Sequence, residues 1–192
     1  MAVIGAPPEL VRRTPADAFP ALITRHGAGD GDDCGWASRR SFGASSWLVV
    51  RPGGHALWAE HFTCPRWIHA ADADAAPGAE QRVEGREPVV LDGDLTLIPT
   101  PGHTAGSMVA VLRQRAQVLF SGDHLWWQPA LGEVVASCRS CWWNRQEQVR
   151  SVERRLDLDV AWLLPGHGDR HAIAPGEWRA AITRTMSLAK GG

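Results

Sequence analysis

Two histidines and one aspartate stand at the ends of three apolar segments in the second half of the chain. Residues 97–107 read LIPTPGHTAGS and contain His103, residues 118–123 read VLFSGD and end in Asp123, and residues 161–168 read AWLLPGHG and contain His167. In each segment an apolar run typical of a buried strand meets a turn rich in glycine. Imidazole nitrogen and carboxylate oxygen are ligands of zinc, iron and manganese. We therefore expect His103, Asp123 and His167 to form a metal site.

The turn that carries His103 is the most strongly marked of the three. Pro99 and Pro101 stop the preceding strand, because proline cannot donate a backbone hydrogen bond. Gly102 permits backbone angles that other residues avoid. Together these residues predict a tight turn at a strand end that presents one imidazole outward.

The composition is that of a globular protein and names no charged partner. The chain has 192 residues and a formal net charge of −1, so its overall charge gives no indication of nucleic acid binding. No leader peptide and no apolar run long enough to cross a membrane is visible, and the four cysteines fit a reducing compartment. We expect an N-terminal arm over residues 1–20, one domain over residues 21–192, a cytoplasmic location, and a small-molecule substrate rather than a membrane or nucleic acid partner.

Hydrophobic periodicity and turn residues predict a strand-rich first part and helices later in the chain. Strands are expected at residues 45–51, 65–70, 88–92, 94–99, 107–113, 117–121 and 160–164, and helices at 55–62, 144–158 and 175–188. Residues 72–86 and 125–143 are expected to be loops. Antiparallel strand pairs flanked by helices favour a layered α/β sandwich.

Three motifs in order carry a resemblance to a known family. TPGHTAGS (100–107), FSGDHL (120–125) and LLPGHGD (163–169) resemble the metallo-β-lactamase fold metallo-hydrolases, a superfamily with glyoxalase II-like members. The resemblance covers roughly residues 42–168. It implies an αββα sandwich with a metal site at the strand ends.

The chain departs from the family pattern before these motifs. Members carry a signature of the type HxHxDH, and its best counterpart here is His55, with Gly54 where the signature has aspartate. Only residues 51–54 lie between Val50 of the expected strand and His55 at the start of the expected helix. The resemblance therefore implies an internal deletion that removes most of the signature, with one or two strands and a helix of the sandwich.

The resemblance implies a metal-dependent hydrolase whose metal-bound hydroxide attacks an ester, a thioester or a related small substrate. It assigns His55, His103, Asp123 and His167 as metal ligands, with Asp123 and His103 as the catalytic pair. One zinc ion is expected rather than two, and iron or manganese are alternatives. Because the aspartate that orients water is replaced by Gly54, we expect reduced turnover.

Two alternatives to the hydrolase remain open at this stage. The first is a catalytically degenerate relative that keeps the fold and acts as a binding module or has no activity. The second is an oxygenase-type relative with one iron held by His, His and Asp. The deletion would also expose sheet edges, which favours a homodimer.

Tryptophan and cysteine residues lie between the second and third motifs. Trp126 and Trp127 are predicted to bind substrate with Trp142 and Trp143 nearby, although covering a sheet edge would equally account for these side chains. Cys138 and Cys141 form a CxxC pair, which is expected to consist of plain loop cysteines because a zinc ribbon needs a second pair.

Overall fold

The computed structural model describes residues 2–4, 26–27, 45–46, 49–50, 65–91, 93–113, 116–136, 141–167 and 170–191. The chain divides into two compact units, Met1–Glu84 and Gly85–Gly192. The predicted helix at residues 55–62 and the predicted ligand His55 lie outside the described residues. Each unit is considered by itself, and the predicted domain limits remain a prediction.

The first unit contains a four-stranded sheet with the order β4-β1-β5-β6. Its strands are β1 (Ala2–Ile4), β4 (Val49–Val50), β5 (Arg66–His69) and β6 (Gln81–Val83), and a separate pair is formed by β2 (His26–Gly27) and β3 (Ser45–Ser46). β1 runs antiparallel to β4 and β5, whereas β6 is parallel to β5. The start of the predicted N-terminal arm is therefore a strand in this structure.

The prediction of a loop over residues 72–86 is wrong. The chain leaves β5 through the 3-10 helix η1 (Ala70–Ala75) and enters β6 parallel to β5. The His69 ring caps η1, because its Nδ1 accepts the Ala71 N–H at 3.1 Å. The sequence analysis did not predict η1 and β6, because they consist mainly of polar and small residues and are too short to show a hydrophobic period.

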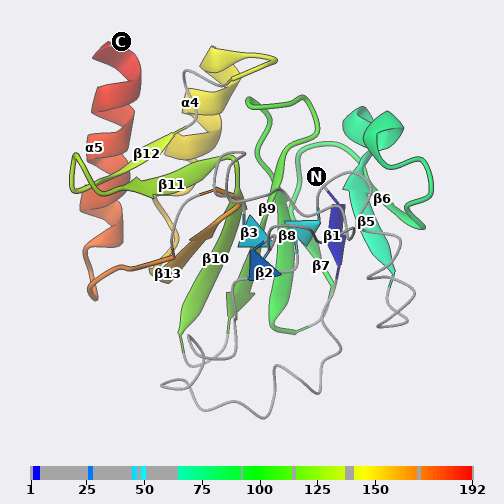
Figure 1. Cartoon of the computed structure of the whole chain (residues 1–192), viewed down its shortest axis with the longest axis horizontal. Coiled ribbons are helices and arrows are strands. Elements are labelled where there is room, and N and C mark those ends of the chain that lie inside the picture. Colours follow the sequence, from blue (N-terminus) through cyan, green and yellow to red (C-terminus); the bar gives the residue numbers. More distant parts are fainter. Residues whose placement is uncertain are drawn as a thin grey trace. The chain divides into compact units, whose positions relative to one another are not determined.

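The second unit contains a six-stranded sheet with the order β14-β13-β10-β9-β8-β7. In chain order its strands are β7 (Val89–Val90), β8 (Leu95–Pro99), β9 (Met108–Arg113), β10 (Gln117–Gly122), β13 (Val160–Pro165) and β14 (His171–Ala172). β7 to β10 form an antiparallel series, and β13 joins β10 in parallel. Figure 1 shows β8, β9 and β10 of this sheet side by side.

The predicted strands of this unit are confirmed, including the turn after Val90 and the strand pair before Asp123. The prediction of a loop over residues 125–143 is wrong, because β11 (Leu125–Gln128) and β12 (Glu133–Ala136) form an antiparallel hairpin. The aromatic residues of β11 alternate between two faces, but the run is short and lacks a clear polar partner at each second position. β14 was also not predicted.

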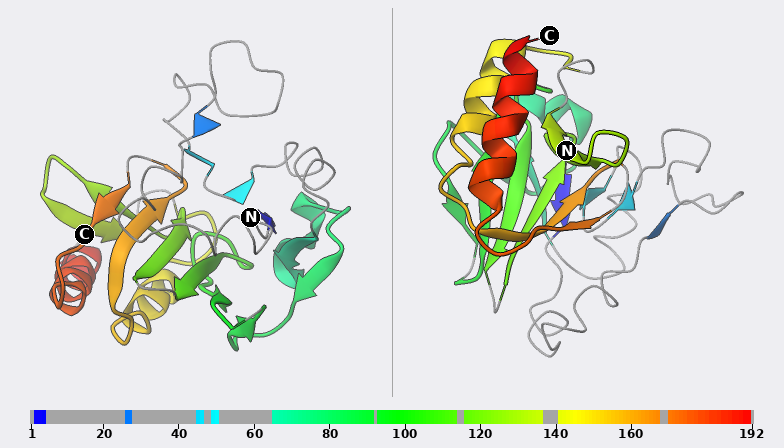
Figure 2. Two further views of the ribbon diagram at one scale, coloured as in Figure 1. Left: turned by 90° about the horizontal axis from the view of Figure 1, so that it is seen from below. Right: turned by 90° about the vertical axis from the view of Figure 1, so that its left-hand side faces the viewer.

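Two helices pack against one face of this sheet. α4 (Arg145–Glu153) begins after Asn144, whose side chain accepts the Glu147 N–H at 3.1 Å, as the N-cap prediction required. α5 (Trp178–Gly191) begins three residues after Pro175, where the predicted helix started. Figure 2 shows α4 and α5 side by side, next to the strands. No helix among the described residues has both the length and the apolar character needed to cross a membrane.

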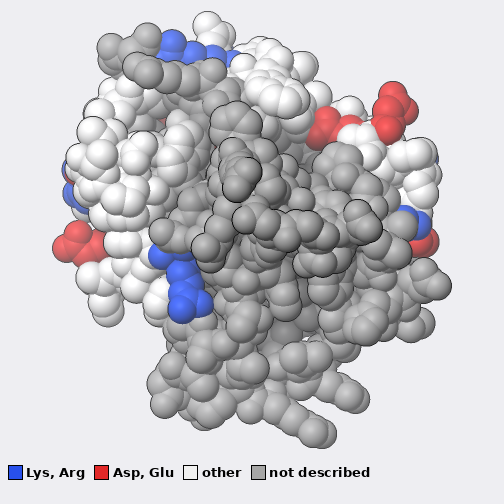
Figure 3. All heavy atoms as spheres, viewed as in Figure 1, with Lys and Arg blue, Asp and Glu red and all other residues white. Residues whose placement is uncertain are grey.

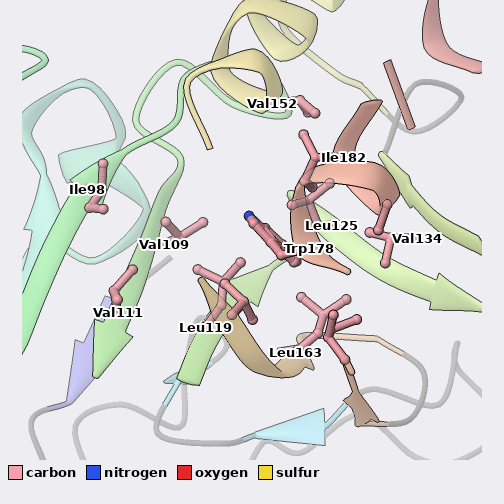
Figure 4. Packing of buried hydrophobic residues seen from close by; sticks show 13 residues of the cluster. Ile98, Val109, Val111, Leu119, Leu125, Val134, Val152, Leu163, Trp178 and Ile182 are labelled. Carbon is pink, nitrogen blue, oxygen red and sulfur yellow. The ribbon is translucent and has the colours of Figure 1, made fainter. Parts of the chain in front are cut away.

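The core of the second unit lies between the sheet and these helices. Figure 4 shows Trp178 of α5 directed toward Leu119 and Leu163 of the central strands, with Val152 of α4 and Ile182 nearby. All five side chains are at most 1% exposed. The Trp178 indole N–H donates to the Arg155 carbonyl at 2.7 Å, so burying the ring leaves no unpaired donor.

Truncation of the central strand should reveal this packing. We expect Leu163→Ala to lower the free energy of unfolding by about 2–5 kcal/mol, because it leaves a cavity under α5. Leu188→Ala, at a half-exposed position of the same helix layer, should change it by less than about 0.5 kcal/mol. Urea denaturation followed by circular dichroism measures both, and equal effects would contradict the assigned core.

Candidate metal centre

The sheet topology brings the ends of three strands to one edge. β10 and β13 are parallel neighbours, with Gly122 opposite Pro165, so the turns that follow them lie next to one another. β8 is separated from β10 only by the antiparallel β9, and therefore ends at the same edge. Asp123, His167 and His103 follow these three strands, which is the arrangement that the motifs predicted.

The carboxylate of Asp123 lies between the two imidazoles. Its Oδ1 is 2.5 Å from Nδ1 of His167, and its Oδ2 is 3.6 Å from Nε2 of His103. The His103 side chain is 14% exposed, whereas those of Asp123 and His167 are 34% and 36% exposed. The three groups are thus held by the protein on one side and open to solvent on the other.

Hydrogen bonds within the turn hold His103 in place. The Thr100 N–H donates to the Ser107 carbonyl at 2.7 Å, which closes the turn between β8 and β9. Inside it, the Gly102 N–H donates to the Thr104 carbonyl at 2.9 Å, and the Ser107 hydroxyl accepts the Thr104 N–H at 2.9 Å. The polar residues of the TPGHTAGS motif therefore serve the turn, and leave the imidazole to face Asp123.

The third turn approaches Asp123 so closely that it requires a glycine. The Gly166 N–H donates to the Gly122 carbonyl at 2.7 Å. A Cβ atom on Gly166 would lie only 2.8 Å from Oδ1 of Asp123. The absence of a side chain at this position allows His167 to reach the carboxylate.

The first residues and the buried side of α4 hydrogen-bond to the turns of His103 and Asp123 through three polar groups. The Asn144 N–H donates to the Gly102 carbonyl at 3.0 Å, and the Ser151 hydroxyl donates to the Pro101 carbonyl at 2.7 Å. The Gln148 side-chain amide donates to the carbonyl of His124 at 3.0 Å. One helix thereby fixes both the His103 turn and the Asp123 turn. The spacing i, i+4, i+7 of these residues is a helical face, but the sequence analysis did not connect it with the site.

Gly102 lies directly against this helix. A Cβ atom there would overlap with Gln148, including its Cα and its Cβ, the latter at 2.6 Å. The φ angle of Gly102 is +152°, which side-chain-bearing residues rarely adopt. The residue before His103 therefore has to be glycine for α4 to dock.

His124 is a buried neutral histidine beneath the site. It is 2% exposed, and burial lowers the pKa of its imidazole to about 3, with the positive charge of Arg155 adding to the effect. The ring is therefore uncharged at neutral pH. His124 therefore adds no positive charge next to Asp123. The carboxylate of Asp123 lies close to the imidazoles of His103 and His167.

The aromatic residues near the site occupy different environments. Trp127 stacks on His171 with 3.5 Å between ring centroids and an angle of 4°, and it packs against the core cluster. Trp126 is half-buried on the other side of β11. Trp142 is 83% exposed, and its ring centroid lies 5.7 Å from that of His103. The substrate-binding role of Trp126 and Trp127 remains a prediction.

The cysteine pair is only partly described. Cys141 is a free thiol whose Sγ donates to the Gly102 carbonyl at 2.9 Å. Cys138 lies outside the described residues. On the face in Figure 3, charged side chains of the described residues form small separate groups of either sign, in keeping with a net charge of −1.

The donor atoms suit a divalent metal in type and, for one pair, in spacing. Two ligands of one tetrahedral zinc ion lie about 3.3 Å apart, and His103 Nε2 and Asp123 Oδ2 are separated by 3.6 Å. Asp123 Oδ1 and His167 Nδ1 are joined by a hydrogen bond of 2.5 Å, which a metal ion held by both groups would replace. As arranged, no group of three or more His, Cys, Asp or Glu in the described part of the chain could hold a metal ion.

No protein-family model matches the chain, but two curated proteins are similar to parts of it. The uncharacterized protein YobT of Bacillus subtilis is 34% identical in an alignment 85 residues long, which covers 40% of this chain and 35% of that protein. A hydroxyacylglutathione hydrolase of Hyphomonas neptunium is 26% identical over 128 residues, 66% of this chain and 49% of that protein. The chain thus spans between a third and a half of the length of these relatives.

Solved structures of metallo-β-lactamases are similar to the fold. The DIM-1 metallo-β-lactamase matches with a TM-score of 0.51 and 20% identity, over 72% of this chain and 63% of that protein. A metallo-β-lactamase from Pontibacter korlensis matches with a TM-score of 0.52 and 18% identity, over 73% of this chain and 64% of that protein. This chain is therefore an α/β protein with the metallo-β-lactamase fold. The resemblance read from the three motifs is confirmed at the level of the fold.

The contact between Gly102 and α4 can be tested with a single methyl group. We expect Gly102→Ala to lower the free energy of unfolding by about 1–3 kcal/mol, because the new Cβ overlaps with Gln148 and the backbone angle is unfavourable for alanine. Gly93→Ala, where nothing lies within 4 Å of the added Cβ, should be nearly neutral. Thermal unfolding measures the stability of both variants. An unchanged stability of Gly102→Ala would show that α4 does not pack against Gly102 as described.

The hydrogen bond from α4 to the Asp123 turn gives a second prediction. We expect Gln148→Leu to lower the free energy of unfolding by about 1–3 kcal/mol, because the fully buried glutamine is replaced and the His124 carbonyl loses its donor. Gln146→Leu, at an exposed position of the same helix, is the matched control and should change it by less than about 0.5 kcal/mol. Urea titrations compare the two, and an equal effect would contradict the proposed contact.

Proposed function

We propose that the protein is a metal-dependent hydrolase that acts on a small ester or thioester, with His103, Asp123 and His167 as metal ligands. The observation that carries the proposal is the carboxylate of Asp123 between two imidazoles, at the shared edge of β8, β10 and β13. Zinc is the preferred ion for this donor set, and one ion is proposed rather than two.

A bound zinc ion would supply hydroxide at neutral pH, since it lowers the pKa of bound water to about 7. The residues of the chain prepare the site for this chemistry. The hydrogen bond between Asp123 Oδ1 and His167 Nδ1 keeps that imidazole beside the carboxylate. The buried neutral His124 beneath adds no charge, and α4 fixes the turns of His103 and Asp123.

A fourth ligand is proposed from the sequence alone. His55 lies outside the described residues, and Gly54 precedes it in place of the signature aspartate. We propose that turnover is slow as a result, because no carboxylate at this position orients the attacking water. The related protein from Hyphomonas neptunium, whose name describes hydrolysis of a hydroxyacyl derivative of glutathione, supports a thioester as substrate.

Metal content is the direct test of the ligand set. The full chain, purified without chelator, should contain about one zinc or iron ion per molecule by mass spectrometry. His103→Ala, Asp123→Ala and His167→Ala should each lower the metal content strongly, because each removes one of the few ligands proposed for a single ion. His171→Phe, which removes a nearby imidazole but can keep the stack on Trp127, should leave the metal content unchanged.

The outcomes separate the proposal from its alternatives. Metal together with release of thiol from a panel of simple thioesters supports the hydrolase. Metal without turnover of any ester or thioester contradicts it, and iron with oxygen consumption would indicate the oxygenase-type relative. No metal in the wild-type chain would indicate the catalytically degenerate relative.

A further inference from the structure

Trp142 is an exposed aromatic residue beside the proposed reaction centre. Its side chain is 83% exposed, although tryptophan is usually mostly buried. Its ring lies against that of His103, with centroids 5.7 Å apart and planes at 35°. The indole therefore borders the His103 imidazole, whose Nε2 lies 3.6 Å from Asp123 Oδ2.

The backbone around Trp142 is held in place by the His103 turn. The Trp142 N–H donates to the His103 carbonyl at 3.0 Å. On either side, the Cys141 thiol and the Asn144 N–H both donate to the Gly102 carbonyl, at 2.9 Å and 3.0 Å. Helix α4 begins directly after this segment and fixes its end. The exposed ring thus belongs to a segment whose backbone is hydrogen-bonded to the turn that carries His103.

A pinned and exposed indole is suited to binding a ligand. Its open surface is a large apolar π face, which stacks well on planar aromatic groups. The backbone that carries the indole is already ordered in the folded protein. Binding of a ligand therefore costs little free energy for ordering this segment. The two rings are tilted by 35°, and the Asp123 carboxylate lies 3.6 Å from Nε2 of His103.

We propose that Trp142 is a specificity-determining residue, and that it stacks on a planar aromatic group in the acyl part of the substrate. The inference rests on the proposed hydrolase function and deepens it by naming the substrate class as arylacyl esters or thioesters. It places the recognition of substrate on the segment before α4. The predicted wall of Trp126 and Trp127 differs from it, since the ring of Trp127 is already stacked on His171.

Two thioesters of equal size test the proposal. S-phenylacetyl-N-acetylcysteamine and S-cyclohexylacetyl-N-acetylcysteamine share a leaving group and differ in whether the acyl ring is planar. With the zinc-loaded full chain and thiol release as readout, we expect kcat/KM to favour the phenylacetyl thioester by about two- to tenfold. Trp142→Ala should bring this ratio to about one, Trp142→Phe should restore most of it, and the half-exposed neighbour variant Trp143→Ala should leave it unchanged.

The results distinguish this proposal from the hydrolase proposal. An unchanged ratio in Trp142→Ala, or an equal loss in Trp143→Ala, overturns the role of Trp142 while hydrolysis itself stands. If the wild-type chain hydrolyses neither these two thioesters nor any ester or thioester of the panel, the hydrolase proposal fails. Saturation-transfer NMR with phenylacetate and cyclohexylacetate then decides the role of Trp142. Preferred binding of phenylacetate that is lost in Trp142→Ala supports the platform, and binding without preference overturns it.

Discussion

The parallel pairing of β10 with β13 is the constraint on which the site depends. It sets Gly122 opposite Pro165, so the turns of Asp123 and His167 must share the space beyond one pair of strand ends. Only a glycine at position 166 fits there, since a Cβ would come within 2.8 Å of the carboxylate. The short contact between Asp123 and His167 follows from this backbone geometry, and the chemistry proposed for the site follows from that contact.

Helix α4 extends the same constraint to the first turn. Its polar face meets Gly102 so closely that no side chain fits between them, and it hydrogen-bonds to Pro101 and His124 through Ser151 and Gln148. Val152, one turn after Gln148 on the buried side of the helix, belongs to the hydrophobic core. One short helix therefore couples the packing of the domain to the positions of the proposed ligands, because a shift of α4 would move two of the three turns.

The same segment links the site to its surroundings. The chain from Cys141 to Asn144 hydrogen-bonds to the His103 turn before it enters α4, and it carries the most exposed of the large hydrophobic residues in the described part of the chain, Trp142. Exposing an indole is unfavourable in water, yet its backbone is firmly held. Residues 142–148 thus include the proposed substrate-binding ring of Trp142, the N-cap of α4 and the buried amide of Gln148.

The sequence by itself determined the strands that carry the motifs and the cap of α4, because apolar periodicity, proline and glycine act over a few neighbouring residues. The metallo-β-lactamase fold was predicted from the resemblance of the three motifs, since periodicity alone indicated only a layered α/β sandwich. It also predicted that His103, Asp123 and His167 converge, since their strands end in similar turns. It missed the β11–β12 hairpin, β6 and β14, which are too short for a periodic signal. Only the tertiary structure decided that Gly102 lies on Gln148, that Trp127 stacks on His171 and that Trp142 borders His103. These contacts join residues far apart in the chain or depend on the exact docking of α4, and no local pattern encodes them.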